Sequence, residues 1–157
     1  MPKDHGIGAS PKRREDVRFL TGAGNYTDDI NVHGQAYVHF LRSDVAHGRI
    51  TGIDTAKASG MPGVVRVFTG ADFEGVGGLP CGWQVTDKHG QPMQEPAHPV
   101  LAQGKVRHVG DPIAAVVADS LEEARTAAEA IEVEIEELPA VVDMAKALED
   151  GATKVHD

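Results

Sequence analysis

The sequence predicts an α+β (mixed α/β) fold, in which short helices lie on a mixed β-sheet. Two hydrophobic periodicities support this class. Residues 36–41 and 131–136 alternate with period two, which is typical of β-strands. Between them, residues 120–130 carry a helix start signal and a narrow apolar face at helical spacing. The length of 157 residues corresponds to about one domain.

Composition excludes several classes of protein. Hydrophobic residues make up 41% and charged residues 25%, which is a globular mixture, and the 4% aromatic content predicts a core of Val, Ile, Leu and Ala. A net charge of −9 argues against general binding of nucleic acid. The single cysteine, Cys81, excludes an internal disulfide and a cysteine-rich metal site. No apolar run reaches the length of a membrane span and no secretory signal is visible, so we expect a cytoplasmic protein.

The chain begins with a stretch of mixed charge. Residues 1–13 carry no apolar stripe and are predicted to be extended or mobile in isolation. Residues 14–20 form the first predicted helix, which Gly22 and Gly24 end. We interpret residues 1–30 as an arm with one short helix.

Three strands are predicted next, at residues 36–41, 49–53 and 64–68. Both faces of the first are largely apolar, which predicts a strand that is covered on two sides. A short helix is predicted between the second and third strands. We expect Asp54 to cap its start and Gly60 to take a left-handed conformation at its end.

Residues 71–99 are the least regular part of the sequence and are rich in Gly and Pro. Loops of this length in a compact domain usually have a functional or interface role. This loop also contains Cys81 and the only tryptophan, Trp83. We predict that Trp83 and the loop face a partner or a substrate funnel.

Regular structure returns in the last third. Residues 106–109 are predicted to be ordered, and residues 113–118 are predicted to be a buried strand. Ser120 and Glu123 have the spacing of a capping box for the helix that follows. The strand at 131–136 presents Ile and Val on one face and Glu on the other. This strand–helix–strand order resembles a crossover unit. Asp143 is predicted to cap a last helix at 144–148, which Gly151 ends.

A search for chemistry finds no complete site. Glycine clusters at 6–8, 22–24 and 75–78 lack the preceding strand and following helix of a phosphate loop. The eight histidines include no i, i+4 pair, and Cys81 has no activating context in the sequence. We therefore predict no catalytic, cofactor-binding or metal-binding residue in this chain.

Six segments, taken together, resemble one family. In order and spacing they are similar to the N-terminal a/b hammerhead region of the molybdenum-binding large subunit of xanthine dehydrogenases, aldehyde oxidases and carbon monoxide dehydrogenases. The resemblance covers about residues 13–145. The segments are residues 14–22, 24–30, 42–47, 62–65, 109–118 and 138–143.

The resemblance implies a part in a molybdenum-dependent oxidoreductase complex. Such complexes hydroxylate carbon centres or oxidise carbon monoxide. They use molybdenum on molybdopterin, as the cytosine dinucleotide in the bacterial branch, together with iron–sulfur clusters and FAD. The family's reactive residues lie downstream of the hammerhead region, so none transfers to this chain. The implied partners are a C-terminal molybdenum-binding region and the iron–sulfur and flavin subunits.

The resemblance also implies a division of the chain. Residues 1–30 would be the arm, residues 31–143 the hammerhead domain, and residues 144–157 a helix with the start of a linker to a molybdenum-binding region. The expected role is scaffolding and subunit contact, with no activity of the chain alone. Two alternatives stay open: an independent binding module, or a small hydrolase that uses Cys81. A homo-oligomer also stays open.

Overall fold

The computed structural model describes residues 6–157, so the first part of the segment predicted to be extended lies outside the described residues. The chain divides into two compact units, one ending at Gln35 and the other comprising residues 36–157. Within residues 6–157, no helix combines the length and the hydropathy that crossing a membrane requires.

The first unit contains the predicted helix. Helix α1 spans Asp16–Leu20, and the short 3-10 helix η1 spans Thr27–Asp29. The rings of Phe19 and Tyr26 stack with their centroids 4.7 Å apart, which joins the helix to the turn that follows. The Tyr26 backbone N–H donates to Asp29 Oδ2 at 2.8 Å. The helix prediction is confirmed, with a start two residues later than expected.

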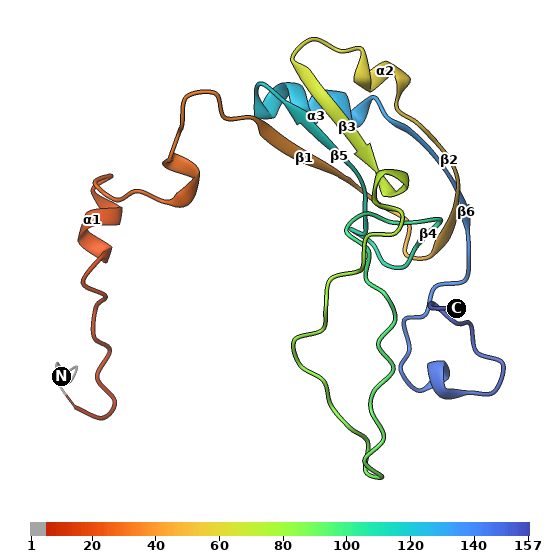
Figure 1. Cartoon of the computed structure of the whole chain (residues 1–157). Helices are drawn as coiled ribbons and strands as arrows, with labels where there is room; N and C mark the ends of the chain where they lie inside the picture. Colours follow the sequence, from red (N-terminus) through yellow and green to blue (C-terminus); the bar gives the residue numbers. More distant parts are fainter. Residues whose placement is uncertain (1–5) are drawn as a thin grey trace. The chain divides into compact units, whose positions relative to one another are not determined.

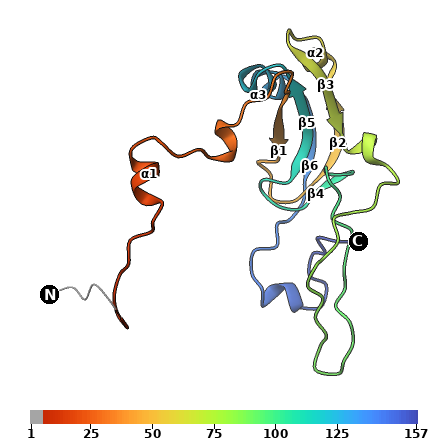
Figure 2. The same ribbon diagram turned by 60° about the vertical axis from the view of Figure 1, so that its left-hand side comes forward.

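The second unit contains two three-stranded sheets (Figures 1 and 2). The first sheet has the order β1 (Tyr37–Arg42), β5 (Pro112–Ala118) and β3 (Val64–Thr69). The second has the order β4 (Lys105–Val106), β2 (Gly48–Asp54) and β6 (Glu132–Glu137). The four strand pairings in the described part of the chain are antiparallel.

Helix α3 (Leu121–Glu129) covers one face of the first sheet (Figure 1). Ser120 Oγ accepts from the Glu123 backbone N–H at 3.2 Å, which confirms the predicted N-cap. The Glu123 carboxylate accepts from the Ser120 hydroxyl at 2.7 Å, whereas a capping box uses the backbone N–H. Small alanines let the helix approach the sheet closely. The buried cluster contains Ala58, Ala114, Val116, Ala118, Ala124, Ala127, Ala128 and Ile131.

A second buried cluster of Ala102, Val106 and Ile113 lies against the second sheet. Ile53 of β2 and Val133 of β6 pack against both clusters. The two sheets therefore share one continuous apolar interior. As predicted from the low aromatic content, this interior is aliphatic.

The α+β class is confirmed, but the crossover prediction for residues 113–136 is wrong. Strands β5 and β6 belong to different sheets. Strand β6 pairs with β2, so that Ile135 lies opposite Ile50 and Val133 lies opposite Ile53. Periodicity shows which residues form a strand and which face is buried, but it does not show the partner strand.

One turn prediction, at Gly60, is corrected. Helix α2 spans Ala56–Ser59, and Gly60 after it has φ −91°, so Gly60 is not left-handed. The left-handed residue is Gly63, with φ +74°, which turns the chain into β3. The N-cap position is Thr55, one residue later than predicted, but Asp54 still bonds the start of the helix, because its Oδ1 accepts from the Ala56 N–H at 2.8 Å.

Two further elements are shorter than predicted. Strand β4 consists of Lys105 and Val106, so only Val106 of the segment predicted to be ordered at 106–109 lies in a strand. The last predicted helix is the 3-10 helix η3, Lys146–Leu148. Asp143 has the predicted capping role, since its Oδ1 accepts from the N–H groups of Ala145 and Lys146 at 2.9 and 3.2 Å.

Candidate functional site

The first sheet has an uncovered apolar face on the side away from α3. Val38 and Phe40 of β1 point to this side and are 47% and 40% exposed. Val38 lies opposite Val117 of β5, and Phe40 lies opposite Ala115. The sequence analysis predicted that β1 is covered on both faces. That prediction is wrong, because only the face of Tyr37, His39 and Leu41 is covered in this structure.

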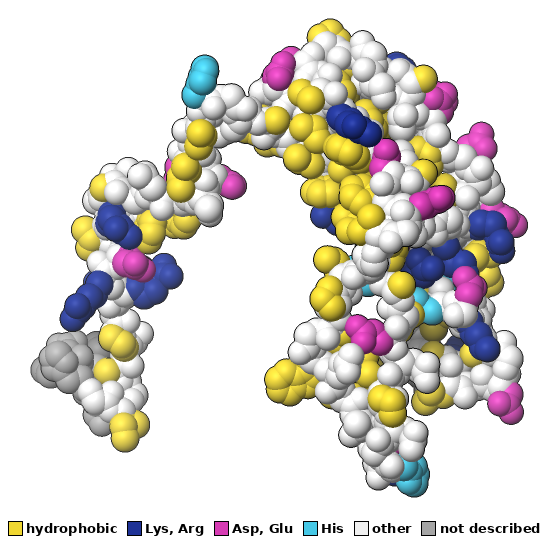
Figure 3. Space-filling model, viewed as in Figure 1, with side chains coloured by type: hydrophobic (Ala, Val, Ile, Leu, Met, Phe, Trp, Pro, Cys, Tyr) yellow, Lys and Arg dark blue, Asp and Glu magenta, His cyan; other side chains and the backbone are white. Residues whose placement is uncertain are grey.

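We call this surface the outer sheet face and define it by Val38, Phe40, Phe68 and Val117. Hydrophobic side chains gather over β1, β3 and β5 in Figure 3. The Arg42 guanidinium lies 5.6 Å from the centre of the Phe40 ring, and that of Arg66 lies 4.8 Å from the centre of the Phe68 ring. The outer sheet face is therefore apolar and aromatic, with a guanidinium over each ring.

The irregular loop predicted at residues 71–99 forms a hairpin arm with two legs (Figure 1). Thr86 bridges to Pro92, and the Asp87 N–H donates to the Gln91 carbonyl at 2.9 Å near the tip. Glu95 joins the legs, because its carboxylate accepts from the Cys81 N–H at 2.8 Å and from the Gln84 amide at 2.7 Å. Sequence periodicity did not show this pairing, which depends on side-chain hydrogen bonds.

Trp83 is 81% exposed on the hairpin arm, as its predicted role in facing a partner requires. Cys81 is also exposed, and its thiol donates to the Trp83 carbonyl oxygen at 3.2 Å. Cys81 and His98 line the same shallow pocket. The thiol hydrogen bond is directed to a backbone oxygen rather than to a base, so the geometry does not activate Cys81 as a nucleophile.

His47 belongs to one of the six family-like segments and has a structural position. Its side chain is 2% exposed, and its Nδ1 lies 2.9 Å from the Pro139 carbonyl oxygen. The His47 carbonyl accepts from the Leu138 N–H at 2.9 Å. These two contacts hold the turn between β1 and β2 to the chain that leaves β6.

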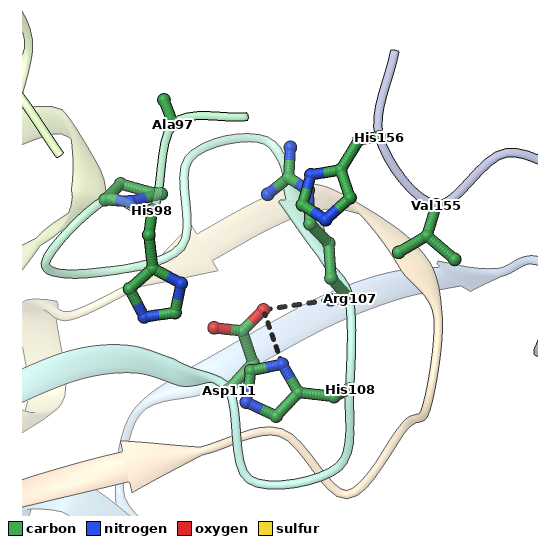
Figure 4. A pocket seen from close by; sticks show the side chains of 8 residues that line it. Ala97, His98, Arg107, His108, Asp111, Val155 and His156 are labelled. Atoms are coloured by element: carbon green, nitrogen blue, oxygen red, sulfur yellow. Dashed lines mark hydrogen bonds and ion pairs between the residues drawn. The ribbon is translucent and has the colours of Figure 1, made fainter. Parts of the chain in front are cut away.

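A polar cavity of about 130 Å³ lies at the base of the hairpin arm (Figure 4). Asp111 is buried beside it, and its Oδ2 accepts from the Arg107 backbone N–H at 2.9 Å and lies 3.8 Å from His108 Nδ1. Figure 4 shows the Arg107 guanidinium beside the ring of His156. The lining residues are Ala97, His98, Pro99, Arg107, His108, Asp111, Val155 and His156.

The ionisable side chains around this cavity are mainly of basic types, Arg, Lys and His. Burial lowers the pKa of His156, and the positive charges of Arg107 and Lys105 lower it further. Lys105 Nζ binds Asp157 at 2.7 Å, and its hydrogen bond is the largest cause that holds the pKa of Asp157 below 3.8. Across residues 6–157, no group of three His, Cys, Asp or Glu side chains is arranged to hold a metal ion.

Comparison with known proteins identifies relatives. Residues 21–139 match the model of the aldehyde oxidase and xanthine dehydrogenase a/b hammerhead domain. The chain is 42% identical over 145 residues to the nicotine 6-hydroxylase large subunit of Paenarthrobacter nicotinovorans, covering 92% of this chain and 17% of that protein. It is 40% identical over 151 residues to the carbon monoxide dehydrogenase large chain of Afipia carboxidovorans, covering 96% and 17%.

The solved structures agree. The crystal structure of quinoline 2-oxidoreductase from Pseudomonas putida 86 aligns with a TM-score of 0.78 and 42% identity, over 97% of this chain and 19% of that chain. Another relative, 32% identical over 92% of this chain and 19% of its own length, is the xanthine dehydrogenase molybdenum-binding subunit of Escherichia coli O157:H7.

These relatives are oxidoreductases that include molybdenum enzymes, and several are named as subunits of larger complexes. The chain spans about a fifth of the length of the relatives that it matches. The match includes the hairpin arm and both sheets but not helix α1. The chain belongs to the aldehyde oxidase and xanthine dehydrogenase family, whose a/b hammerhead domain it contains at residues 21–139.

Proposed function

We propose that this chain is the docking and scaffolding domain of a molybdenum hydroxylase large subunit. In this proposal the outer sheet face packs against the molybdenum-binding part of that subunit. The observation that supports it best is the exposure of Val38 and Phe40 on a sheet whose opposite face α3 already covers. A sheet with two apolar faces is stable when a second layer covers the uncovered one.

The proposal assigns the chemistry to other parts of the complex. Catalytic, cofactor-binding and metal-binding residues would all lie outside residues 1–157. The complex would hold molybdenum on molybdopterin cytosine dinucleotide, with iron–sulfur clusters and FAD on partner subunits, and would be cytoplasmic. Oxidoreductase activity would belong to the assembled complex, and the chain alone would have none.

The division of the chain follows the same proposal. Residues 1–30 would be an arm that contacts a partner, residues 31–143 the hammerhead domain, and residues 144–157 the start of the connection to the molybdenum-binding part. The hairpin arm with Trp83 would be a second contact to a subunit. An independent binding module is disfavoured, because such a protein rarely leaves an aromatic sheet face uncovered.

A binding experiment with the wild-type chain and two variants tests this proposal. We expect the tagged chain to retain the remainder of the xanthine dehydrogenase molybdenum-binding subunit of Escherichia coli O157:H7 in a pull-down. Phe40→Asp should weaken retention at least about tenfold, because it buries an unpaired charge in the contact. Leu121→Asp is the matched control, since Leu121 is 54% exposed at the start of α3 and lies off the outer sheet face. Equal retention of the two variants would contradict the proposal.

A further inference from the structure

The polar cavity at the base of the hairpin arm gathers basic groups in an acidic protein. The chain has a net charge of −9, yet Arg107 and three of its eight histidines line this one cavity. The histidines come from separate segments: His98 from the end of the hairpin arm, His108 from the turn before β5, and His156 from the C-terminal segment. Only the folded chain brings them together.

The acidic side chain in the cavity already has partners. Asp111 Oδ2 accepts from the Arg107 backbone N–H at 2.9 Å and lies 3.8 Å from His108 Nδ1. Asp157 binds Lys105 at 2.7 Å and does not line the cavity. Asp111 therefore orders the turn before β5, and Asp157 holds Lys105. The donors that are left to face the cavity are His98, His156 and the Arg107 guanidinium.

The Arg107 guanidinium has unused donor capacity. Its Nη1 donates to the Lys105 carbonyl at 3.3 Å. Its Nε is buried, and no residue among 6–157 accepts a hydrogen bond from it. A buried N–H without an acceptor destabilises the site, and a charged one more than a neutral one. An anion near the guanidinium would supply the missing acceptor.

We propose that this cavity binds a small oxyanion of the phosphate class. The Arg107 guanidinium supplies a planar set of donors, and His98 and His156 approach from the two sides that Figure 4 shows. Pro99 and Val155 add apolar lining, and contacts between charged groups are stronger next to apolar side chains than in open water. The volume of about 130 Å³ is that of a site for a small ion or for the phosphate group of a larger molecule. This inference is independent of the proposed docking function.

A bound oxyanion would change the titration of His156 in a definite direction. Burial lowers its pKa most, Arg107, Lys105 and His98 lower it further, and Asp157 raises it. An added negative charge next to the ring opposes the basic neighbours and favours the imidazolium form, so the pKa of His156 should rise on binding. His108 and Asp111 also line the cavity, with His108 Nδ1 3.8 Å from Asp111 Oδ2.

The experiment follows histidine ring resonances by NMR during a titration of the whole chain with inorganic phosphate. A parallel titration with sodium chloride matches the ionic strength. We expect saturable shifts of His98 and His156 in phosphate alone, and an upward shift of the His156 midpoint by at least about half a pH unit. A third arm uses glycerol 1-phosphate: saturable shifts there show that the site accepts a phosphate ester, and their absence assigns it to the free ion.

Variants make the test specific. Arg107→Gln removes the guanidinium and keeps the backbone N–H bonded to Asp111, and His156→Asn removes one imidazole. Each should weaken phosphate binding at least fivefold, by about 1 kcal/mol or more at RT ln 5. His89→Asn, at the tip of the hairpin arm, is the control and should bind as the wild type does. Identical shifts in phosphate and chloride, or unchanged binding in both cavity variants, would overturn the proposal.

Discussion

At the scale of single residues, Gly70 shows how closely the chain after β3 approaches the backbone of Ala102. A Cβ atom built at Gly70 would collide with the carbonyl oxygen of Ala102. We predict that Gly70→Ala destabilises the protein by about 1–3 kcal/mol, since backbone on both sides leaves little room to adjust. Gly77→Ala is the control, because nothing lies within 4 Å of its Cβ position. Urea unfolding measures both, and an equal midpoint for the two variants would show that this contact is not tight.

Asp72 provides a prediction about pH. The backbone N–H of Thr69 donates to its carboxylate at 2.8 Å and is the largest cause that lowers the pKa of Asp72 below 3.8, with Arg66 contributing from 3.7 Å. A lowered carboxyl pKa adds stability above the unfolded value, and this stability disappears as the pH falls through the folded value.

Asp72→Asn should therefore lower the melting temperature at pH 7, and the difference from the wild type should shrink as the pH falls through the lowered pKa of Asp72, because the wild type then loses its charge at this position. Thermal unfolding followed by circular dichroism across this range measures the difference. Glu74→Gln serves as the control for loss of one nearby negative charge. A melting difference between wild type and Asp72→Asn that stayed constant down to the lowest pH would contradict this explanation.

Residue-scale prediction from sequence succeeded where the signal is local. Ser120, Asp54 and Asp143 bond the N–H groups at helix starts, as their types and spacing predict. It failed at Gly60, because both Gly60 and Gly63 follow the short helix and the sequence does not show which one turns the chain. The basic cavity was missed for a related reason: His98, His108 and His156 lie far apart in the sequence and give no spacing signal.

At the scale of elements, strand β6 tests the assignment of faces. Val133 packs against both buried clusters, while Glu134 is exposed on the other face. Val133→Asp should destabilise the protein by about 3 kcal/mol or more, because it buries an unpaired charge. Glu134→Gln should change stability by less than about 0.5 kcal/mol. Similar melting temperatures for the two variants would refute the face assignment.

Strand positions could be predicted because alternation is a property of each segment alone. Strands β1, β2, β3, β5 and β6 begin and end within about two residues of the predicted bounds. The pairing could not be predicted, since it depends on contacts between distant segments. Strand β6 pairs with β2, from which 77 residues of sequence separate it, rather than with β5, the strand that precedes it in the chain.

At the scale of the whole molecule, the family resemblance predicted more than periodicity could. Six short segments in order indicated the hammerhead domain, and the comparison confirms it over residues 21–139. The apolar residues on both sides of β1 predicted a strand that is covered on both faces. In the structure one of these faces, the outer sheet face, has no covering layer. Under the proposed function, the layer that covers these apolar residues belongs to the molybdenum-binding part of the large subunit.

The central claim is that this chain supplies docking surface to a molybdenum enzyme. The most direct measurement replaces the matching segment of the xanthine dehydrogenase molybdenum-binding subunit of Escherichia coli O157:H7 with this chain and determines molybdenum content and subunit assembly of the purified complex. The account predicts assembly and molybdenum content close to those of the parent complex, and loss of both when Phe40→Asp is added. A chimera that fails to assemble although the isolated chain is folded, or one that assembles equally well with Phe40→Asp, would contradict the account.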